Sequence, residues 1–178
     1  QNDKTIPYLK AMNARGRHIF VRPAFEREAH YMLHDDLDKR GLERHHKQDG
    51  KFKPGRMVVE SSPGNYQVWV RSERALSVEE KKYWLDRMDS DPGASPRHRW
   101  GRAPWFRNRK EKYEIMEGDK KLYPLAKLIW VDWKGRAAVP EVELPKPEIE
   151  QRSKPSLVKT NSAARSGRHL FPRQSGLA

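Results

Sequence analysis

The chain has 178 residues, a formal net charge of +13 and a hydrophobic content of 35%, and it contains no cysteine. These values exclude disulfides, zinc ribbons and thiol catalysis, and no apolar run approaches the roughly 20 residues that a membrane span requires. No positively charged segment followed by an apolar one opens the sequence, so we expect no secretory signal and a cytoplasmic protein. A strong positive charge is typical of proteins that bind polyanions, nucleic acid first.

The composition divides the chain into two parts. We predict an ordered domain over residues 1–139 and a Pro-rich, basic tail or linker over residues 140–178. Residues 145–178 carry seven Lys and Arg against two Asp and Glu, and such a composition buries too little apolar surface to offset the entropy of ordering. We therefore expect this tail to be extended and to make few contacts with the domain.

Apolar periodicity and turn signals predict an α+β domain with an antiparallel sheet and flanking helices on one face. In chain order we expect a helix over Ile6–Ala14, strands over His18–Arg22 and His30–His34, a charged helical segment over Asp38–Lys47 that breaks at Gly41 and Gly50, strands over Arg56–Glu60 and Tyr66–Val70, a helix opened by a Ser77/Glu80 capping box, a basic loop over Ser95–Lys112 and an apolar segment over Leu122–Val131. The His45-His46 pair in the charged segment is expected to be solvated.

Two adjacent carboxylates, Asp35 and Asp36, come directly after the strand His30–His34. Because neighbouring strand residues point to opposite faces, both can reach one site only if the strand ends between them. Such a pair suits a hard divalent cation, although capping of the next helix by Asp36, with Asp35 in solvent, is the simpler interpretation. Asp91, just before Pro92, is a third candidate carboxylate or an ordinary turn residue.

Two further motifs carry groups that bind nucleotides or nucleic acid. Asn65 and Gln67 are two residues apart, so their amides face one side of a strand and can hydrogen-bond a base, ribose or phosphate; a plain hairpin turn is the alternative. Residues 97–112 contain seven basic residues against one Glu, interleaved with three large aromatic residues. Basic side chains neutralise phosphates and aromatic faces stack bases, so this loop predicts nucleic-acid contact.

Other kinds of site find no support in the sequence. It contains neither a P-loop, a dinucleotide-binding glycine motif nor a serine-hydrolase elbow, and no histidine spacing argues for zinc.

Taken in order, these segments resemble the RepB-like DNA primases of mobilisable plasmids, within the archaeo-eukaryotic primase superfamily. The motifs that carry the resemblance are Ile6-Pro-Tyr-Leu-Lys-Ala-Met-Asn13, His18-Ile-Phe-Val-Arg-Pro23, Leu33-His-Asp-Asp-Leu37, Val58-Val-Glu-Ser-Ser-Pro-Gly-Asn-Tyr-Gln-Val-Trp-Val70, Asp89-Ser-Asp-Pro92, Gly101-Arg102 and Phe106-Arg-Asn-Arg-Lys-Glu-Lys112. Related primases often carry Pro-Gly between that Arg and Asn, where this chain has Pro104-Trp105. Members of this family also tend to have an extra strand before the first helix and a helical domain after the catalytic domain. Neither is visible in this sequence, which favours a module of a larger mobilisation or replication protein.

The resemblance implies a catalytic sheet domain related to the RNA-recognition motif, with metal-bound acids on its open face. It assigns catalysis and the binding of Mg²⁺ or Mn²⁺ to Asp35, Asp36 and Asp91. It assigns nucleotide binding to Ser62, Asn65, Gln67, Arg102, Asn108 and Lys110. The basic loop adds the expected nucleic-acid contacts Arg97, Arg99, Trp100, Trp105, Arg107 and Arg109.

The implied activity is that of a primase, a nucleotidyltransferase that joins nucleoside triphosphates on a single-stranded DNA template during plasmid or mobile-element replication or transfer, by a two-metal mechanism. The implied partners are the template, the nucleotides, and a helical domain or a relaxase or helicase module outside this chain, with no membrane. A non-catalytic single-stranded DNA-binding module and a metal-dependent nuclease are the two alternatives.

Overall fold

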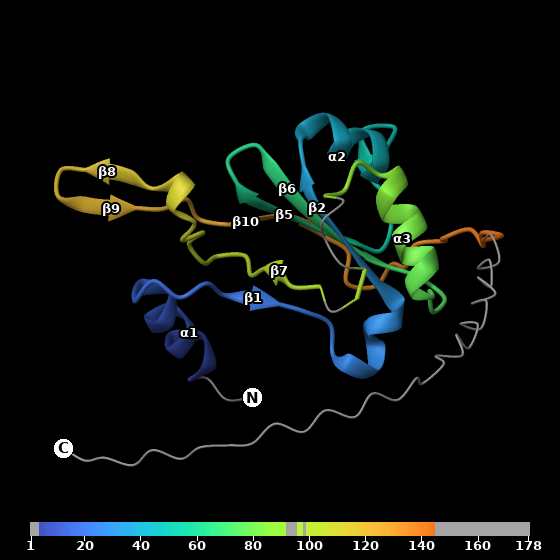
Figure 1. The fold of residues 1–178 in the computed structure, drawn as a ribbon, viewed down its shortest axis with the longest axis horizontal. Coiled ribbons are helices and arrows are strands. Elements are labelled where there is room, and N and C mark those ends of the chain that lie inside the picture. The colour runs from blue at the N-terminus through green and yellow to red at the C-terminus, as the bar shows by residue number, and fades with distance from the viewer. Residues whose placement is uncertain (1–3, 92–95, 98, 145–178) are drawn as a thin grey trace, which may run out of the picture. The chain divides into compact units, whose positions relative to one another are not determined.

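The computed structural model describes residues 4–91, 96–97 and 99–144. Its centre is a four-stranded antiparallel sheet in the order β10-β5-β6-β2 (Figure 1). The strands are β2 (Tyr31–Leu37), β5 (Arg56–Ser62), β6 (Asn65–Arg71) and β10 (Lys127–Val131). The α+β fold with an antiparallel sheet and flanking helices is thus confirmed.

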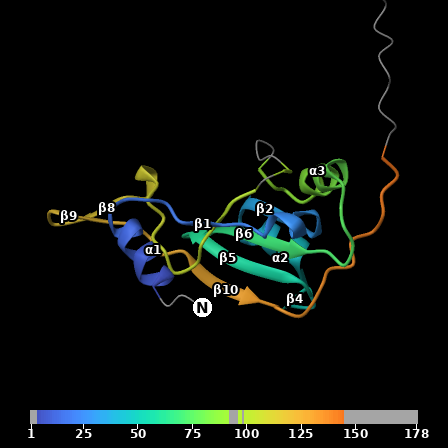
Figure 2. The same ribbon diagram turned by 90° about the horizontal axis from the view of Figure 1, so that it is seen from below.

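In the described part of the chain, three α-helices accompany the sheet: α1 (Thr5–Ala14), α2 (Lys39–His46) and α3 (Val78–Arg87). The predicted capping box opens α3, because the Ser77 side chain accepts from the Glu80 N–H and the Glu80 side chain accepts from the Ser77 N–H. Figures 1 and 2 place α1 and α3 at opposite ends of the sheet. None of the helices in the described part of the chain is long and apolar enough to cross a membrane.

Short elements complete the fold. They are β1 (Phe20–Val21), β3 (Lys47–Gln48), β4 (Lys51–Phe52), β7 (Gly101–Arg102), β8 (Ile115–Glu117), β9 (Lys120–Leu122) and the 3₁₀ turns η1 (Phe25–His30) and η2 (Glu111–Tyr113). The predicted strand over His18–Arg22 is therefore reduced to two residues, and it pairs with β7 rather than joining the main sheet. Strand pairs β3–β4 and β8–β9 are hairpins that the sequence analysis did not predict.

The main core lies between the sheet and the helices α2 and α3. Its buried members are Met32, Leu37, Leu42, Val58, Val68, Val70, Leu76 and Ala137, with Trp84 of α3 packed against them. A second cluster, Ile19, Ala103 and Phe106, packs with Leu9 and Met12 of α1. Since Val68 and Val70 face the helices, their neighbours Gln67 and Trp69 face the other side of the sheet, where β7 crosses. The expectation that all helices cover one face therefore holds for α2 and α3 only.

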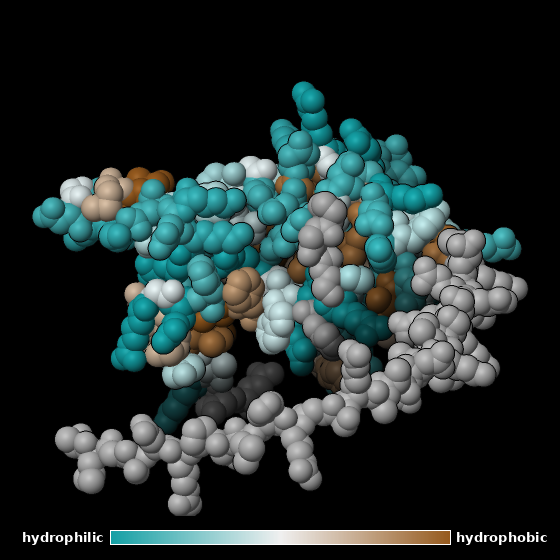
Figure 3. Space-filling model, viewed as in Figure 1, coloured by the Kyte–Doolittle hydropathy of each residue, from teal (hydrophilic) through white to brown (hydrophobic). Residues whose placement is uncertain are grey.

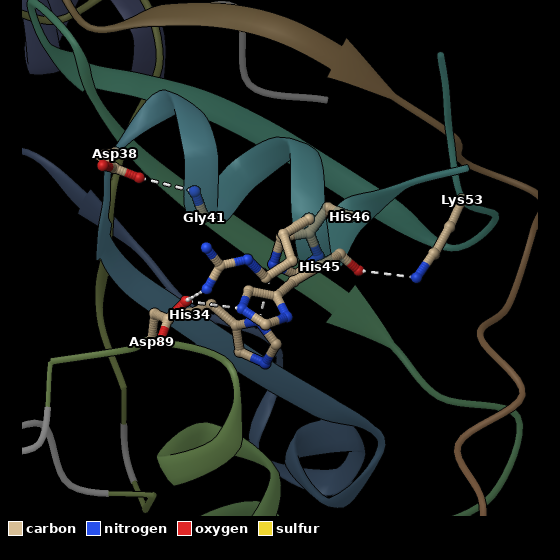
Figure 4. A network of polar contacts seen from close by, with 8 residues as sticks. His34, Asp38, Gly41, His45, His46, Lys53 and Asp89 are labelled. Carbon is tan, nitrogen blue, oxygen red and sulfur yellow. Dashed lines mark hydrogen bonds and ion pairs between the residues drawn. The ribbon is translucent and has the colours of Figure 1, made fainter. Parts of the chain in front are cut away.

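The charged segment is a continuous helix, not one broken at Gly41. The Asp38 carboxylate caps it by accepting from the Gly41 N–H at 2.6 Å (Figure 4). A Cβ at Gly41 would lie 3.3 Å from the Asp38 carboxylate and 3.4 Å from the Leu37 side chain, so this glycine lets the first turn lie close to β2. Because Asp38 is the cap, the interpretation of Asp36 as the capping residue is wrong.

The expectation that His45-His46 is solvated is also wrong. His46 is fully buried, and its Nε2 lies 2.9 Å from Nδ1 of the buried His34 on β2 (Figure 4). The ring of His45 lies 2.8 Å from the Asp89 carboxylate, which also accepts from Arg44 at 3.1 Å. These contacts join the end of α2 to β2 and to the chain that leaves α3, which a single-sequence reading of a charged segment cannot detect.

Gly101 allows β7 to cross directly over the sheet. A Cβ there would lie 2.5 Å from Nε1 of Trp69 and 3.0 Å from Cε2. Gly101→Ala is therefore expected to lower the free energy of unfolding by about 1–3 kcal/mol, because either the strand or the indole must move. Chemical denaturation measures this change; equal stability of the variant and the wild type would contradict the packing described here.

The chain separates into two units, Gln1–Leu144 and Pro145–Ala178. The second unit lies outside the described residues. The predicted boundary at residues 139/140 and the extended basic tail therefore stay predictions.

Candidate active site

Strand β2 does not end between Asp35 and Asp36, contrary to the sequence argument. It continues to Leu37 through an irregularity, because its register with β6 shifts between His34 and Leu37. Asp36 has a φ of +57°, in the left-handed region, which is the conformation of a bulged residue. The Asp36 N–H donates to Oδ1 of Asp35 at 2.8 Å. The bulge interrupts the strict alternation of side chains along β2, so Asp35 and Asp36 can reach the same site although the strand continues past them.

Two side-chain amides on β6 donate hydrogen bonds to these carboxylates. Gln67 donates from Nε2 to Oδ1 of Asp35 at 2.7 Å, and Asn65 donates from Nδ2 to Oδ1 of Asp36 at 3.0 Å. Asn65 and Gln67 are two residues apart on one strand, so both carboxylates lie on the same side of the sheet. These hydrogen bonds all use Oδ1 of the two carboxylates, and among the described residues Oδ2 of each accepts no hydrogen bond.

Gln67 also connects the acids to the basic loop. Its Oε1 accepts from the backbone N–H of Arg102 at 2.7 Å. The Arg102 side chain is buried, with Nη1 2.8 Å from Nδ1 of His18 and the guanidinium carbon 4.8 Å from the centre of the Phe20 ring. Burial lowers the pKa of Arg102, while the charge of Asp35 opposes that shift. One run of hydrogen bonds therefore joins Asp36, Asp35, Gln67 and Arg102.

Asp91 lies beside Asp35 through its backbone. Its N–H donates to the carbonyl of Asp35 at 3.2 Å, and the Asp35 N–H donates to the buried Ser90 hydroxyl at 3.1 Å. Burial lowers the pKa of Arg99, and the charges of Asp35 and Asp91 oppose this shift, so one guanidinium lies near both acids. Within residues 4–91, 96–97 and 99–144, no group of three His, Cys, Asp or Glu side chains is arranged to hold a metal ion. The convergence of three carboxylates on one cavity stays a prediction.

The remaining predicted nucleotide-binding residues lie at the tip of the β5–β6 hairpin and in the loop facing it. Asn108 is buried, donates to the Ser61 carbonyl at 2.9 Å and accepts from the Lys110 N–H at 3.3 Å. Its amide therefore fixes the loop that presents the exposed side chain of Lys110. A hydrogen bond with buried Ser62 lowers the pKa of Tyr113.

Three of the predicted DNA-binding arginines hold chain segments together. Arg99 donates to the Leu33 carbonyl at 2.8 Å, Arg107 to the Tyr123 carbonyl at 2.6 Å and Arg109 to the Asn13 carbonyl at 2.9 Å. Arg97 is exposed. Residues 92–95 and 98, which include the Pro of the Asp91-Pro92 turn, lie outside the described residues.

Trp100 and Trp105 are 53% and 61% exposed, which leaves their rings available for stacking. The guanidinium of Arg22 lies 4.9 Å from the centre of the Trp100 ring. Trp105 lines an apolar groove of about 490 Å³ between α1, β1 and the sheet, together with other aromatic side chains, namely Phe20, Tyr31, Trp69, Phe106 and Trp133. Figure 3 shows apolar side chains beside α1 and on the β8–β9 hairpin, and further apolar patches towards α3, among mostly hydrophilic side chains.

Trp105 has a φ of +68°, in the region that favours glycine. By the resemblance inferred from the motifs, it stands at the position where related primases often carry glycine. Replacement of Trp105 by Gly or by Ala removes the same indole, but only Gly adopts this backbone without strain. We expect the Gly variant to be more stable than the Ala variant by about 1 kcal/mol, measured by chemical denaturation. An Ala variant as stable as the Gly variant would show that the left-handed conformation is relaxed when the indole is removed.

The family model of the RepB DNA-primase N-terminal domain matches residues 3–155. The chain belongs to the RepB primase family. Mobilization protein A of Escherichia coli is 35% identical over 119 residues, and a DNA primase of Acidithiobacillus ferrooxidans is 31% identical over 133 residues. These matches cover 65% and 71% of this chain but only 16% and 36% of the relatives, so the chain corresponds to part of each.

Two solved structures share the fold of this RepB primase domain. The catalytic domain of primase RepB' in complex with initiator DNA matches with a TM-score of 0.56 and 31% identity, over 71% of this chain and 63% of that one. Primase RepB' itself matches with a TM-score of 0.55 and 32% identity, over 70% and 41% of the two chains. The resemblance inferred from the motifs is thereby confirmed at the level of family and fold.

Three residues of the RepB primase domain join the site without having been predicted: His18, Ser90 and Tyr113. Burial lowers the pKa of His18, and the charges of Arg102 and Lys110 add to this shift, so the imidazole is neutral where it accepts from Arg102. Ser90 lies one residue before Asp91, and Tyr113 lies shortly after Lys110, so proximity to the motifs is the signal that could have found both. His18 opens a motif of the resemblance, but its side chain carried no signal of its own.

Proposed function

We propose that this RepB primase domain joins nucleoside triphosphates into primers on a single-stranded DNA template, and that Asp35, Asp36 and Asp91 are its catalytic acids. The observation that carries the proposal is the hydrogen-bonded run from Asp36 through Asp35 and Gln67 to Arg102. It connects acids suited to a cation with the backbone of Arg102, whose guanidinium lies beside His18 and is of the type that binds phosphate.

The donor set fits a divalent cation of the Mg²⁺ or Mn²⁺ type. Such ions take carboxylate oxygens and keep several waters, so two adjacent aspartates whose hydrogen bonds among the described residues use Oδ1, and a third aspartate beside them, are suitable ligands. When bound, the ions would lower the pKa of the attacking 3′-hydroxyl and neutralise charge on the departing pyrophosphate. This supports metal-dependent phosphoryl chemistry at Asp35, Asp36 and Asp91.

The neighbouring side chains then bind and orient the nucleotide. Arg102 offers a guanidinium fork and Lys110 a point charge to triphosphate oxygens. The Oδ1 atom of Asn65 is buried and has no hydrogen-bond partner among the described residues, which suits an acceptor for a ribose or base N–H or O–H group. Gln67 and Asn108 position these groups, since their amides are already engaged with Asp35, Arg102 and Ser61.

The template is proposed to contact the exposed tryptophans. Trp105 and Trp100 present open rings near basic side chains, and stacking of bases on aromatic rings tolerates any sequence. Trp105→Ala is expected to weaken single-stranded DNA binding about 5- to 30-fold. Phe25→Ala removes an exposed ring outside the lining of the groove and tests for a general loss of aromatic surface.

The proposal is tested by incubating the chain with a single-stranded template, labelled nucleotides and Mg²⁺ or Mn²⁺, and resolving the products by length. Template-dependent products longer than the input nucleotides are expected. Binding of the template without products, with either ion, would favour the non-catalytic binding module, and shortening of the template would favour the nuclease.

A further inference from the structure

A second polar cavity lies on the helix-covered face of the sheet, away from Gln67. Its volume is about 50 Å³, and its lining includes Met32 and His34 of β2, Arg56 of β5 and Trp84 of α3. Met32 belongs to the main core, and His34 is two residues further along the same strand, so both point to the side of α2 and α3. The cavity is therefore separate from the carboxylates of the candidate active site.

Three buried nitrogen atoms of this lining have no hydrogen-bond partner among the described residues. They are Nε2 of His34, Nε of Arg56 and Nε1 of Trp84. His34 is completely buried and Arg56 is 9% exposed. Buried polar atoms are normally satisfied by protein, water or a ligand, and all three belong to residues that line one cavity. Arg56 and Trp84 can only donate there.

Arg56 also brings a buried positive charge without a counter-charge. Its Nη1 donates to the Pro54 carbonyl, and no carboxylate of the described residues forms an ion pair with it. Burial lowers the pKa of this guanidinium to about 10, which leaves it charged at neutral pH. Buried charges are normally paired, so the cavity combines donors with an uncompensated cation.

The histidine pair can supply the third donor. Nδ1 of His34 lies 2.9 Å from Nε2 of His46, and both rings are fully buried (Figure 4). In the tautomer in which Nε2 of His46 donates to Nδ1 of His34, the His34 proton lies on Nε2 and is available to the cavity. In this tautomer each donor points the same way: His46 on α2 donates to His34 on β2, and His34 donates into the cavity.

We propose that this cavity binds a small inorganic anion of about the size of chloride, through N–H groups of Arg56, Trp84 and His34. The volume exceeds the 10–15 Å³ or so that one water needs, but it is too small for a nucleotide or a nucleic-acid strand. A bound anion neutralises Arg56 and connects β2, β5 and α3. It lies on the face of β2 opposite to the candidate active site. Chloride concentration is then linked to the stability of this part of the domain.

The test uses the full chain and thermal unfolding at constant ionic strength, with sodium chloride replacing sodium gluconate, whose anion is too large for the cavity. The melting temperature is expected to rise with chloride and then to saturate. Trp84→Phe removes one donor and is expected to raise the chloride concentration for the half-maximal effect about tenfold. Tyr83→Phe, one residue away and outside the lining, is the matched control and should behave as the wild type.

A crystal soaked in bromide gives an independent readout, with an anomalous peak expected beside Nε of Arg56 and Nε1 of Trp84. Arg56→Met is expected to lose the chloride dependence, and if this variant does not fold, Trp84→Phe and the bromide peak still decide. Ordered water alone in the cavity of the soaked crystal, a melting temperature indifferent to chloride, or an unchanged response in Trp84→Phe would overturn the proposal.

Discussion

Replacing both Asp35 and Asp36 by Asn is expected to reduce nucleotide joining on the order of 10³-fold or more, because the 3′-hydroxyl is no longer activated and the triphosphate charge no longer neutralised. Asn keeps an Oδ1 that accepts from Gln67, Asn65 and the Asp36 backbone, so the bulge in β2 should persist. Template binding measured without divalent ions should stay the same or tighten, because two negative charges that repel phosphates are removed.

Asp86→Asn on the exposed side of α3 is the control for a change of charge alone, and it should leave joining intact. Arg102→Ala should instead weaken the use of nucleotides and flatten the salt dependence of any phosphate contact that this side chain makes. Loss of template binding in the double Asn variant, with an unchanged circular dichroism spectrum, would contradict the assignment of these acids to metal binding alone.

Acid is expected to destabilise the domain through His46. Burial lowers the pKa of His46 to about 2, and the charge of Arg56 adds to this shift. Its pKa in the unfolded chain is about 6.5. Below that pH the unfolded chain takes up a proton that the buried imidazole excludes, so stability is complete above pH 6.5 and falls as the pH is lowered. Between pH 7.5 and 5.5 this histidine alone should lower the free energy of unfolding by about 1.4 kcal/mol.

Chemical denaturation at several pH values measures this effect. His46→Gln should unfold with a shallower dependence on pH, by about one proton near pH 5.5, whatever its absolute stability. His30→Gln is the control, because His30 lies outside the buried pair and its ring makes a weak contact at 3.4 Å to the Ser72 carbonyl. Equal slopes for the wild type and His46→Gln would show that His46 is accessible to protons in the folded state.

The elements that the sequence predicted well have local causes. The capping box at Ser77 and Glu80 opens α3, and the Pro63-Gly64 turn joins β5 to β6, as the patterns indicate. The two-residue spacing of Asn65 and Gln67 predicted that they face one side, and both contact the aspartates of β2. Such signals are complete within a few residues, so no knowledge of the tertiary structure is needed to read them.

The elements that the sequence did not predict depend on distant contacts. The positive φ of Asp36 occurs in a bulge against β6, and His46 is buried because β2 supplies His34 as its partner. Similarly, composition alone did not separate Arg109, which donates to the Asn13 carbonyl, from the exposed Lys110 next to it. In each case the deciding partner lies outside the motif.

Primer synthesis by this domain is tested most directly by a double-label assay, in which the single-stranded template carries one label and the nucleotides carry another. The wild type and the Asp35→Asn, Asp36→Asn double variant are compared in Mg²⁺ and in Mn²⁺. We expect the wild type to transfer nucleotide label into products longer than one nucleotide only when template is present, and the labelled template to keep its length. The variant is expected to make no product. Template label that shortens, or nucleotide label that never enters a longer product while the template remains bound, would contradict primer synthesis.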